Sequence, residues 1–164
     1  MERFKSIFSV EIYMKYEEFF GRNSEEVARD LLGRYISRKS DGKIIVAEIL
    51  QTGAYEGGNE TDARQGMKYG PGNIFLLPYR GSLLLNFATG ESGEPSCVEI
   101  RNVLSSQGEI KGPGAVSNFL SLDKSLEGIM LGKELQIVGE PEKRPGIKRT
   151  KGSPENCLGY FSLK

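Results

Sequence analysis

Three carboxylates lie close together in QTGAYEGGNETDAR, residues 51–64. Glu56, Glu60 and Asp62 fall within seven residues, beside Tyr55 and in a glycine-rich stretch that favours a loop. Carboxylates at this spacing can activate a water molecule or bind a divalent ion, and the tyrosine ring can stack on a ligand. The alternative is a solvated loop whose charges keep it in water, and composition alone favours that alternative.

Acid–base chemistry in this protein depends mainly on carboxylates, because its 164 residues include no histidine. The lack of imidazole excludes Ser-His triads and most zinc sites. The two cysteines, Cys97 and Cys157, are far apart and lack metal-ligand spacing, so we predict that both are small core residues. We therefore expect neither a metal nor another cofactor.

The charge balance gives no overall sign of a nucleic-acid binder, since 22 basic residues face 22 acidic ones. A local patch is compatible with that balance. The run EKRPGIKRTK, residues 142–151, carries five basic residues and one acid, and includes Lys148, Arg149 and Lys151. Such a run can follow a phosphate backbone, and a solvated surface loop is an equal alternative.

Hydropathy predicts a soluble, cytoplasmic protein, which we expect to be a monomer. No run approaches the ~20 apolar residues that a membrane span needs. The N-terminal segment mixes charges into its apolar positions and lacks the uninterrupted apolar core of a signal peptide.

Short apolar runs separated by glycine and proline predict one α+β domain over residues 1–164, with a curved, mainly antiparallel β-sheet and a few short helices. Asn23 and Ser24 precede apolar positions at helical spacing and Gly33 follows them, which predicts a helix over 24–33. Two apolar runs around SDG predict a β-hairpin over 34–50. Further strands are expected at 73–77, 82–88, 96–104, 134–139 and in the C-terminal CLGYFSLK, and a second helix within GPGAVSNFLSLDKSLEGIML.

Two polar residues interrupt apolar strand patterns and need an explanation. Arg101 lies within CVEIRNVL, where a long cation requires a carboxylate, a phosphate or a base edge as its partner. A structural salt bridge is an equally good interpretation. Asn86 lies within SLLLNFA, and a buried amide also requires hydrogen-bond partners.

The order of several motifs is more specific than any one of them. EEFFGRNSEEVARDLLGR, QTGAYEG, YGPGNIFLLPYRGSLLLNF, SCVEIRNV and KGPGAVSNFL follow one another along the chain. This order resembles the alkyladenine (3-methyladenine) DNA glycosylase family, in which the last four blocks read like ETEAY, PGxxYVYxxYGxxxxxN, CVLLRA and GPGKLxxAL. The ending RPGIKRTKGSPENCLGYFSL is also similar, so the resemblance covers residues 17–164.

The resemblance implies binding of double-stranded DNA that carries damaged purines. Members of this family turn the damaged nucleotide out of the duplex into an aromatic pocket and hydrolyse its N-glycosidic bond. Tyr55 matches the tyrosine that stacks on the base, Tyr79 the side chain that fills the vacated space, and Asn86 the pocket asparagine. Arg101 matches a DNA-contacting arginine, and Phe75 occupies a wall where the family favours tyrosine.

The hydrolytic centre departs from the family pattern. The family's water-activating glutamate falls on Gly53, and its histidine falls at or near Asp62. Gly53 can neither orient water nor stabilise an oxocarbenium ion. Because the missing side chain is expected to leave room, Asp62 or Glu60 is a candidate substitute base, and Glu56 is a weaker one.

The sequence thus predicts a DNA repair protein that binds damaged purines, with hydrolysis either weak or dependent on a different acid. Two alternatives stay open. One is a binder of damaged DNA that cleaves nothing, and the other is a small-molecule or nucleoside-binding protein on the same scaffold, which suits the neutral charge and pI of about 6.4.

Overall fold

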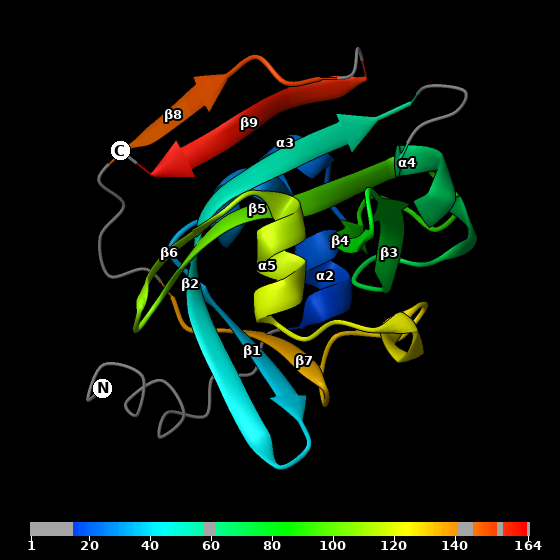
Figure 1. Cartoon of the computed structure of the whole chain (residues 1–164). Coiled ribbons are helices and arrows are strands. Elements are labelled where there is room, and N and C mark those ends of the chain that lie inside the picture. Colours follow the sequence, from blue (N-terminus) through cyan, green and yellow to red (C-terminus); the bar gives the residue numbers. More distant parts are fainter. Residues whose placement is uncertain (1–14, 58–61, 141–145, 154–155, 164) are drawn as a thin grey trace.

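The computed structural model describes residues 15–57, 62–140, 146–153 and 156–163. Within these residues nine strands form one sheet, and short helices accompany it (Figure 1). The strands are β1 (Tyr35–Ser40), β2 (Lys43–Glu56), β3 (Ile74–Tyr79), β4 (Ser82–Ala88), β5 (Ser96–Ser105), β6 (Gly108–Lys111), β7 (Leu135–Val138), β8 (Ile147–Thr150) and β9 (Cys157–Leu163). The helices are α2 (Tyr16–Phe20), α3 (Ser24–Leu31), α4 (Asp62–Gln65) and α5 (Pro113–Phe119), with 3-10 turns η1 (Gly66–Lys68) and η2 (Lys124–Leu126).

The long strand β2 organises the sheet. Along one edge β2 pairs with β5, and along the other its first half pairs with β1 and its second half with β9. The main path runs β3-β4-β5-β2-β1-β7, with β6 on β5 and β8 on β9, and every one of these pairings is antiparallel. The prediction of one α+β domain with a curved, mainly antiparallel sheet is confirmed.

Local sequence signals placed the first helix and the hairpin correctly. The side chain of Asn23 accepts a hydrogen bond from the backbone N–H of Glu26 and so caps α3. Asp41 and Gly42 join β1 to β2 with φ angles of 49° and 75°, the left-handed pair that a two-residue hairpin turn requires.

Two segments expected to be loops contain strands instead. Residues 51–56 continue β2, because β5 and β9 satisfy the backbone groups on both of its edges. Residues 147–150, part of the basic run, form β8, which pairs only with β9 among the described strands. A short, exposed edge strand of this kind lacks the apolar alternation by which strands are recognised.

The sheet carries two apolar clusters, one on each face. The larger cluster packs the sheet against α2, α3 and α5 through residues such as Phe20, Leu31 and Val116. The smaller one contains Tyr55, Ala63, Phe75, Ala88 and Cys97, and so lies between β2, β3, β4, β5 and α4. No helix in the described part of the chain has the length and apolar character needed to cross a membrane.

Candidate active site

A row of five residues crosses the sheet on the face of the smaller cluster. Tyr160 on β9 lies opposite Gly53 on β2, and Gly53 lies opposite Glu99 on β5. Glu99 in turn lies opposite Asn86 on β4, and Asn86 lies opposite Phe75 on β3. Because directly opposed residues in a sheet share a face, all five positions belong to one surface, which we call the central row.

Glu99 and Arg101 form a buried ion pair beside this row. Nη1 of Arg101 lies 2.6 Å from Oε1 of Glu99, and the two side chains are 20% and 2% exposed. Arg101 lies at a bulge, since Thr52 of β2 pairs with Ile100 and Gln51 pairs with Asn102. Bulges re-aim side chains, and this one directs the guanidinium over the ring of Tyr160, 3.8 Å from its centroid.

The environment of Arg101 stabilises its positive charge. Burial by itself lowers the pKa of the guanidinium, but the Glu99 carboxylate and the nearby Tyr55 and Tyr160 outweigh that effect and raise it. Nε of Arg101 also donates to Oε1 of Gln51 at 3.3 Å. The partner that Arg101 requires in its apolar strand is therefore a carboxylate, as the salt-bridge interpretation expected. The Arg101 side chain still reaches the surface along one edge.

The space beside Gly53 is occupied, contrary to expectation. A Cβ atom on this glycine would lie 3.1 Å from Cε2 of Tyr55, 3.2 Å from the Tyr55 hydroxyl and 3.3 Å from Cδ of Arg101. Those separations are tighter than ordinary van der Waals contact. The idea that the missing side chain leaves room for a neighbouring acid is thus wrong, because the ring of Tyr55 and the stem of Arg101 fill that room.

Tyr55 is packed within the sheet face. Its side chain is 2% exposed, and its hydroxyl donates to Oε1 of Glu99 at 3.5 Å. Burial, followed by the negative charge of Glu99, raises the pKa of the phenol far above its usual range. Tyr55 is therefore a neutral hydrogen-bond donor to Glu99, and its ring must move or be approached from the side before it can stack on a ligand.

Asn86 keeps an unpaired acceptor in the central row. Its side chain is fully buried, and Nδ2 donates to the carbonyl oxygen of Leu84 at 3.2 Å. Its Oδ1 atom has no hydrogen-bond partner among the described residues. Phe75, opposite it, is 1% exposed and stacks on Tyr69 with a centroid distance of 6.3 Å. A buried amide with an open acceptor is uncommon and calls for a functional or structural reason.

Tyr79 lies at the exposed tip of the β3–β4 hairpin. Its side chain is 55% exposed, and the guanidinium of Arg80 lies 5.1 Å from its ring centroid. Arg80 and Gly81 form the turn with φ angles of 47° and 84°. Tyr79 follows Phe75 by four positions on β3, so both side chains point to the face of the central row.

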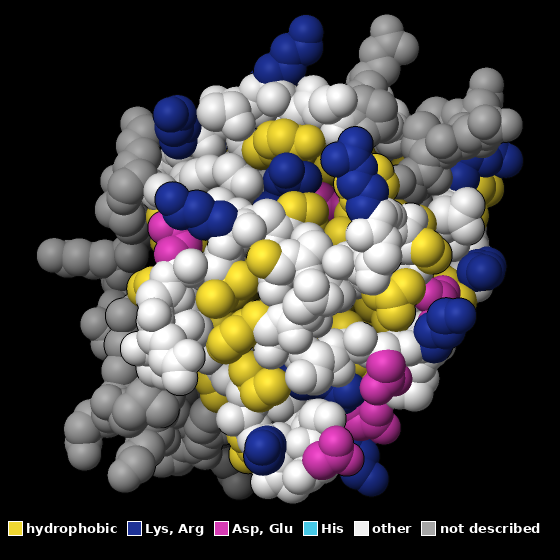
Figure 2. Space-filling model, viewed as in Figure 1, with side chains coloured by type: hydrophobic (Ala, Val, Ile, Leu, Met, Phe, Trp, Pro, Cys, Tyr) yellow, Lys and Arg dark blue, Asp and Glu magenta, His cyan; other side chains and the backbone are white. Residues whose placement is uncertain are grey.

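The basic run divides between the two faces of the sheet. Lys148 lies opposite Ser162, which Gln51 contacts on the face of the central row. Arg149 lies opposite Phe161 of the main core, donates to the carbonyl oxygen of Leu158 and has its guanidinium 6.0 Å from the Phe161 ring. Lys151 is exposed beyond β8. Lys and Arg side chains are scattered over the face shown in Figure 2, including its upper part, right edge and bottom, while most acidic side chains lie at its lower right.

Comparison with known proteins identifies the family. A family model described as methylpurine-DNA glycosylase matches residues 18–152. The chain belongs to this family. A protein of Clostridioides difficile named "Putative 3-methyladenine DNA glycosylase" is 30% identical over 156 residues, which cover 74% of this chain and 77% of that protein. Proteins of the same name from Desulfitobacterium hafniense and Enterococcus faecalis are also 30% identical and cover 82% and 83% of this chain, and 83% and 70% of their own lengths.

Membership of the methylpurine-DNA glycosylase family supports a DNA glycosylase role in DNA repair, with DNA as the substrate. The resemblance read from the motif order is thereby confirmed. Within this frame the central row is the candidate active site, because it contains Gly53 and Asn86 and lies beside Tyr55 and Arg101.

The two predicted substitute bases fall outside what the structure describes. Glu60 lies in the undescribed segment 58–61, and the side chain of Asp62 is likewise outside the described part, although its backbone begins α4. The next residue, Ala63, is fully buried in the cluster that contains Tyr55. Both candidates therefore stay predictions.

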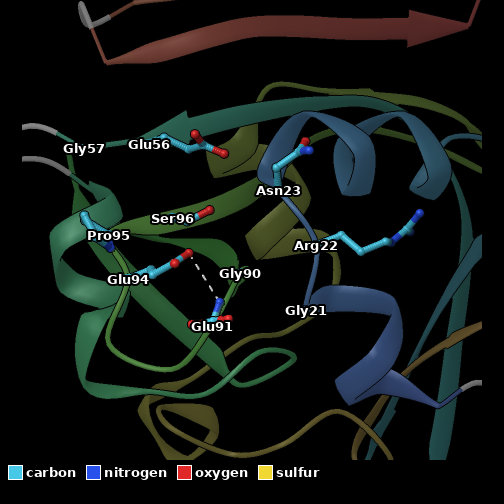
Figure 3. Close-up of a pocket in the computed structure, with 10 residues that line it drawn as sticks. All are labelled: Gly21, Arg22, Asn23, Glu56, Gly57, Gly90, Glu91, Glu94, Pro95 and Ser96. Atoms are coloured by element: carbon cyan, nitrogen blue, oxygen red, sulfur yellow. Dashed lines mark hydrogen bonds between the residues drawn. The ribbon is translucent and has the colours of Figure 1, made fainter.

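Glu56, the weaker candidate base, binds the first residue of α3. Its Oε1 atom accepts hydrogen bonds from the backbone N–H of Ser24 at 3.1 Å and from the Ser24 hydroxyl at 3.0 Å, at the start of α3. It lines an open hollow of about 540 Å³ together with Arg22, Glu91 and Glu94 (Figure 3). In this view Glu94 accepts a hydrogen bond from the backbone N–H of Glu91, and the acidic lining disfavours a phosphate.

Sequence reasoning missed two residues of the central row. Glu99 stands two positions before Arg101 in the same strand, where residues share a face, so the pair could have been recognised as an internal salt bridge. Tyr160 gave no such signal, because only the pairing of β9 with β2 brings it beside Gly53.

Proposed function

We propose that this protein binds duplex DNA containing an alkylated or deaminated purine, extrudes that nucleotide and hydrolyses its N-glycosidic bond. The observation that carries the proposal is the open Oδ1 atom of the fully buried Asn86. An acceptor at this position suits the exocyclic amino group or a ring N–H of a purine. Extrusion costs a few kcal/mol and is least costly at a damaged pair, which favours lesions over normal bases.

The other residues take roles that follow from their exposure. Tyr79 inserts into the duplex from the hairpin tip, since its ring is 55% exposed. Tyr55 and Phe75 provide the aromatic surface on which the extruded base stacks, once the Tyr55 ring moves away from Gly53. Arg101, Lys148 and Lys151 contact the phosphate backbone around the central row. The protein acts as a monomer and needs no cofactor.

Binding without cleavage is the second candidate, and Gly53 favours it. The family's glutamate position has no side chain, and the packed Tyr55 ring and Arg101 stem occupy its surroundings. Loss of a positioned acid–base group typically slows a reaction by about 10²–10⁴-fold, whereas loss of base stacking costs only about 1–3 kcal/mol of binding. Lesion binding and base release can therefore separate.

One experiment distinguishes the candidates. Binding is measured on duplexes that carry hypoxanthine, ethenoadenine or an abasic analogue, and on an undamaged duplex, over a series of salt concentrations. Free base is measured on the first two under single-turnover conditions. We expect tighter binding to the damaged duplexes, an affinity that falls with salt, and base release. Selective binding without release indicates the non-catalytic candidate, and no salt-dependent DNA binding contradicts both.

A further inference from the structure

Glu99 is a buried carboxylate next to the position at which the family's glutamate is absent. It is 2% exposed, and no other Asp or Glu among the described residues is buried. In the central row it stands directly between Gly53 and Asn86. The family pattern CVLLRA has an apolar residue where CVEIRN has this glutamate. A carboxylate is thus missing from one strand and present on its neighbour.

The surroundings of Glu99 keep a negative charge in the sheet. Arg101 lies 2.6 Å from its Oε1 atom, and the Tyr55 hydroxyl donates to the same oxygen at 3.5 Å. Burying an ionised carboxylate is costly unless it is paired and hydrogen-bonded, and both conditions are met here. The Glu99 carboxylate lies on the same face of the sheet as the unpaired Oδ1 atom of Asn86, because the two residues are directly opposed.

An ion pair that only holds Arg101 in place is the simpler explanation. An apolar residue at position 99 would avoid the cost of burying a charge, and replacement of buried pairs by apolar residues is often neutral or stabilising. The orphaned oxygen of Asn86 is a second, independent feature, because it too reduces stability and lies directly opposite Glu99. The buried charge of Glu99 and the unpaired oxygen of Asn86 both reduce stability, and a ligand that contacts both explains them better than an ion pair alone.

We propose that Glu99 is the carboxylate that assists base release, displaced by one strand from the position of the family's glutamate. This inference rests on the proposed function. When an extruded purine enters the central row, the Tyr55 ring moves from Gly53 to stack on it and uncovers Glu99. Gly53 permits the resting position of that ring, since a larger side chain would occupy the same space.

The reaction balances with water as the only co-reactant. The bond between C1′ and the purine nitrogen breaks, and its electron pair leaves with the base. The oxygen of a water molecule forms a new bond to C1′, and the proton that it loses passes to the Glu99 carboxylate. Glu99 then gives that proton to the departing base when the base leaves as an anion, as hypoxanthine does, or to solvent when a cationic alkylated purine leaves as a neutral molecule. Before Glu99 takes up the proton, its negative charge stabilises the positive charge that develops on the sugar. The products are a free base and an abasic site.

Glu99→Gln tests this assignment, because the amide oxygen can still accept a hydrogen bond from Arg101 and only the charge is lost. Three measurements are made on each variant: thermal unfolding, affinity for a duplex with an abasic analogue, and single-turnover release of hypoxanthine. For Glu99→Gln we expect a folded protein with unchanged affinity and release slowed by about 10²–10⁴-fold. Glu91→Gln, an acidic residue of the separate hollow, is the matched control and should release base at the wild-type rate.

Asp62→Asn and Glu60→Gln complete the set, since they test the two rival bases. Release that persists in Glu99→Gln but is abolished in either of these variants overturns the assignment of Glu99 and leaves the proposed function intact. Wild-type protein that binds the lesion and releases no base overturns the assignment together with the catalytic half of the proposed function. If Glu99→Gln does not fold, Glu99→Leu, the residue type of the family pattern at this position, replaces it, and release at the wild-type rate from a folded Glu99→Leu or Glu99→Gln protein contradicts the proposal.

Discussion

The side chain of Arg101 crosses Gly53 as it extends from β5 towards β9. Its Cδ atom lies 3.3 Å from the point where a Cβ atom on residue 53 would stand, and its guanidinium lies 3.8 Å from the ring centroid of Tyr160. The Tyr55 ring covers the same glycine from another direction. Packed side chains therefore enclose position 53, which we predict to match the family's glutamate.

Gly53→Glu should accordingly not restore a family-type active site by itself. The new side chain collides with Tyr55 and Arg101 and places a second carboxylate beside Glu99, so we expect the free energy of unfolding to fall by about 1–3 kcal/mol. Base release should not exceed that of the wild type. Urea denaturation and single-turnover release measure the two effects. Gly53→Ala is the control and should lose less stability, and a stable, faster Gly53→Glu protein would contradict this packing argument.

Glu99 and Arg101 should be strongly coupled in stability. Arg101→Met leaves a buried carboxylate without its ion-pair partner and should cost about 3–5 kcal/mol. Adding Glu99→Leu removes that carboxylate as well, so the double variant should be more stable than the sum of the two single changes predicts, by about 0.5–3 kcal/mol. Denaturant unfolding of all four proteins measures the coupling. Simple additivity would show that the pair contributes no specific interaction.

Asn86→Leu should separate stability from lesion recognition. It removes a buried oxygen that has no partner together with one hydrogen bond, from Nδ2 to the carbonyl oxygen of Leu84, so the free energy of unfolding should change little, while binding to a hypoxanthine duplex weakens. Asn102→Leu is the matched control, because the Oδ1 atom of Asn102 accepts a hydrogen bond from the backbone N–H of Gly112 at 2.8 Å. That control should be destabilised. Equal loss of stability in both variants would make Asn86 a structural residue.

The lysines in and just after β8 should determine the salt dependence of DNA binding. Neutralising Lys148 and Lys151 to glutamine should weaken binding to damaged and undamaged duplexes alike and flatten the slope of log K against log salt by ~2 units. Fluorescence anisotropy over a salt series measures it. Lys39→Gln with Lys43→Gln, at the far hairpin between β1 and β2 (Figure 1), is the charge-matched control. An equal change of the salt slope in that control would show that the slope depends on net charge and not on the position of Lys148 and Lys151.

Tyr79→Ala should weaken lesion binding without loss of stability. The ring is 55% exposed in the free protein, so its removal costs little packing, but the vacated space in an opened duplex is then unfilled. Affinity for a duplex with an abasic analogue and the melting temperature are the two measurements. Ile44→Ala is the matched control, since Ile44 is 54% exposed at the far hairpin. Wild-type affinity in Tyr79→Ala would exclude the wedge role.

Local structure followed from short sequence signals. The α3 cap at Asn23, the turn at Asp41 and Gly42, and the strands around residues 82–88 and 96–105 depend on backbone preferences and on apolar patterns within a few residues. The edge strand at 147–150 was missed because its side chains are mostly exposed and charged, and it exists only through pairing with β9.

The sequence by itself determined the family, through the order of its motifs, and predicted that Gly53 stands where the family has its glutamate. The tertiary structure alone decided what surrounds that glycine. Glu99 and Tyr160 lie far from Gly53 along the chain, and the register of three strands brings them beside it. A shift of one residue in either pairing would turn those side chains to the opposite face. Long-range register depends on the packing of the whole sheet, so no local pattern in the sequence specifies the neighbours of Gly53.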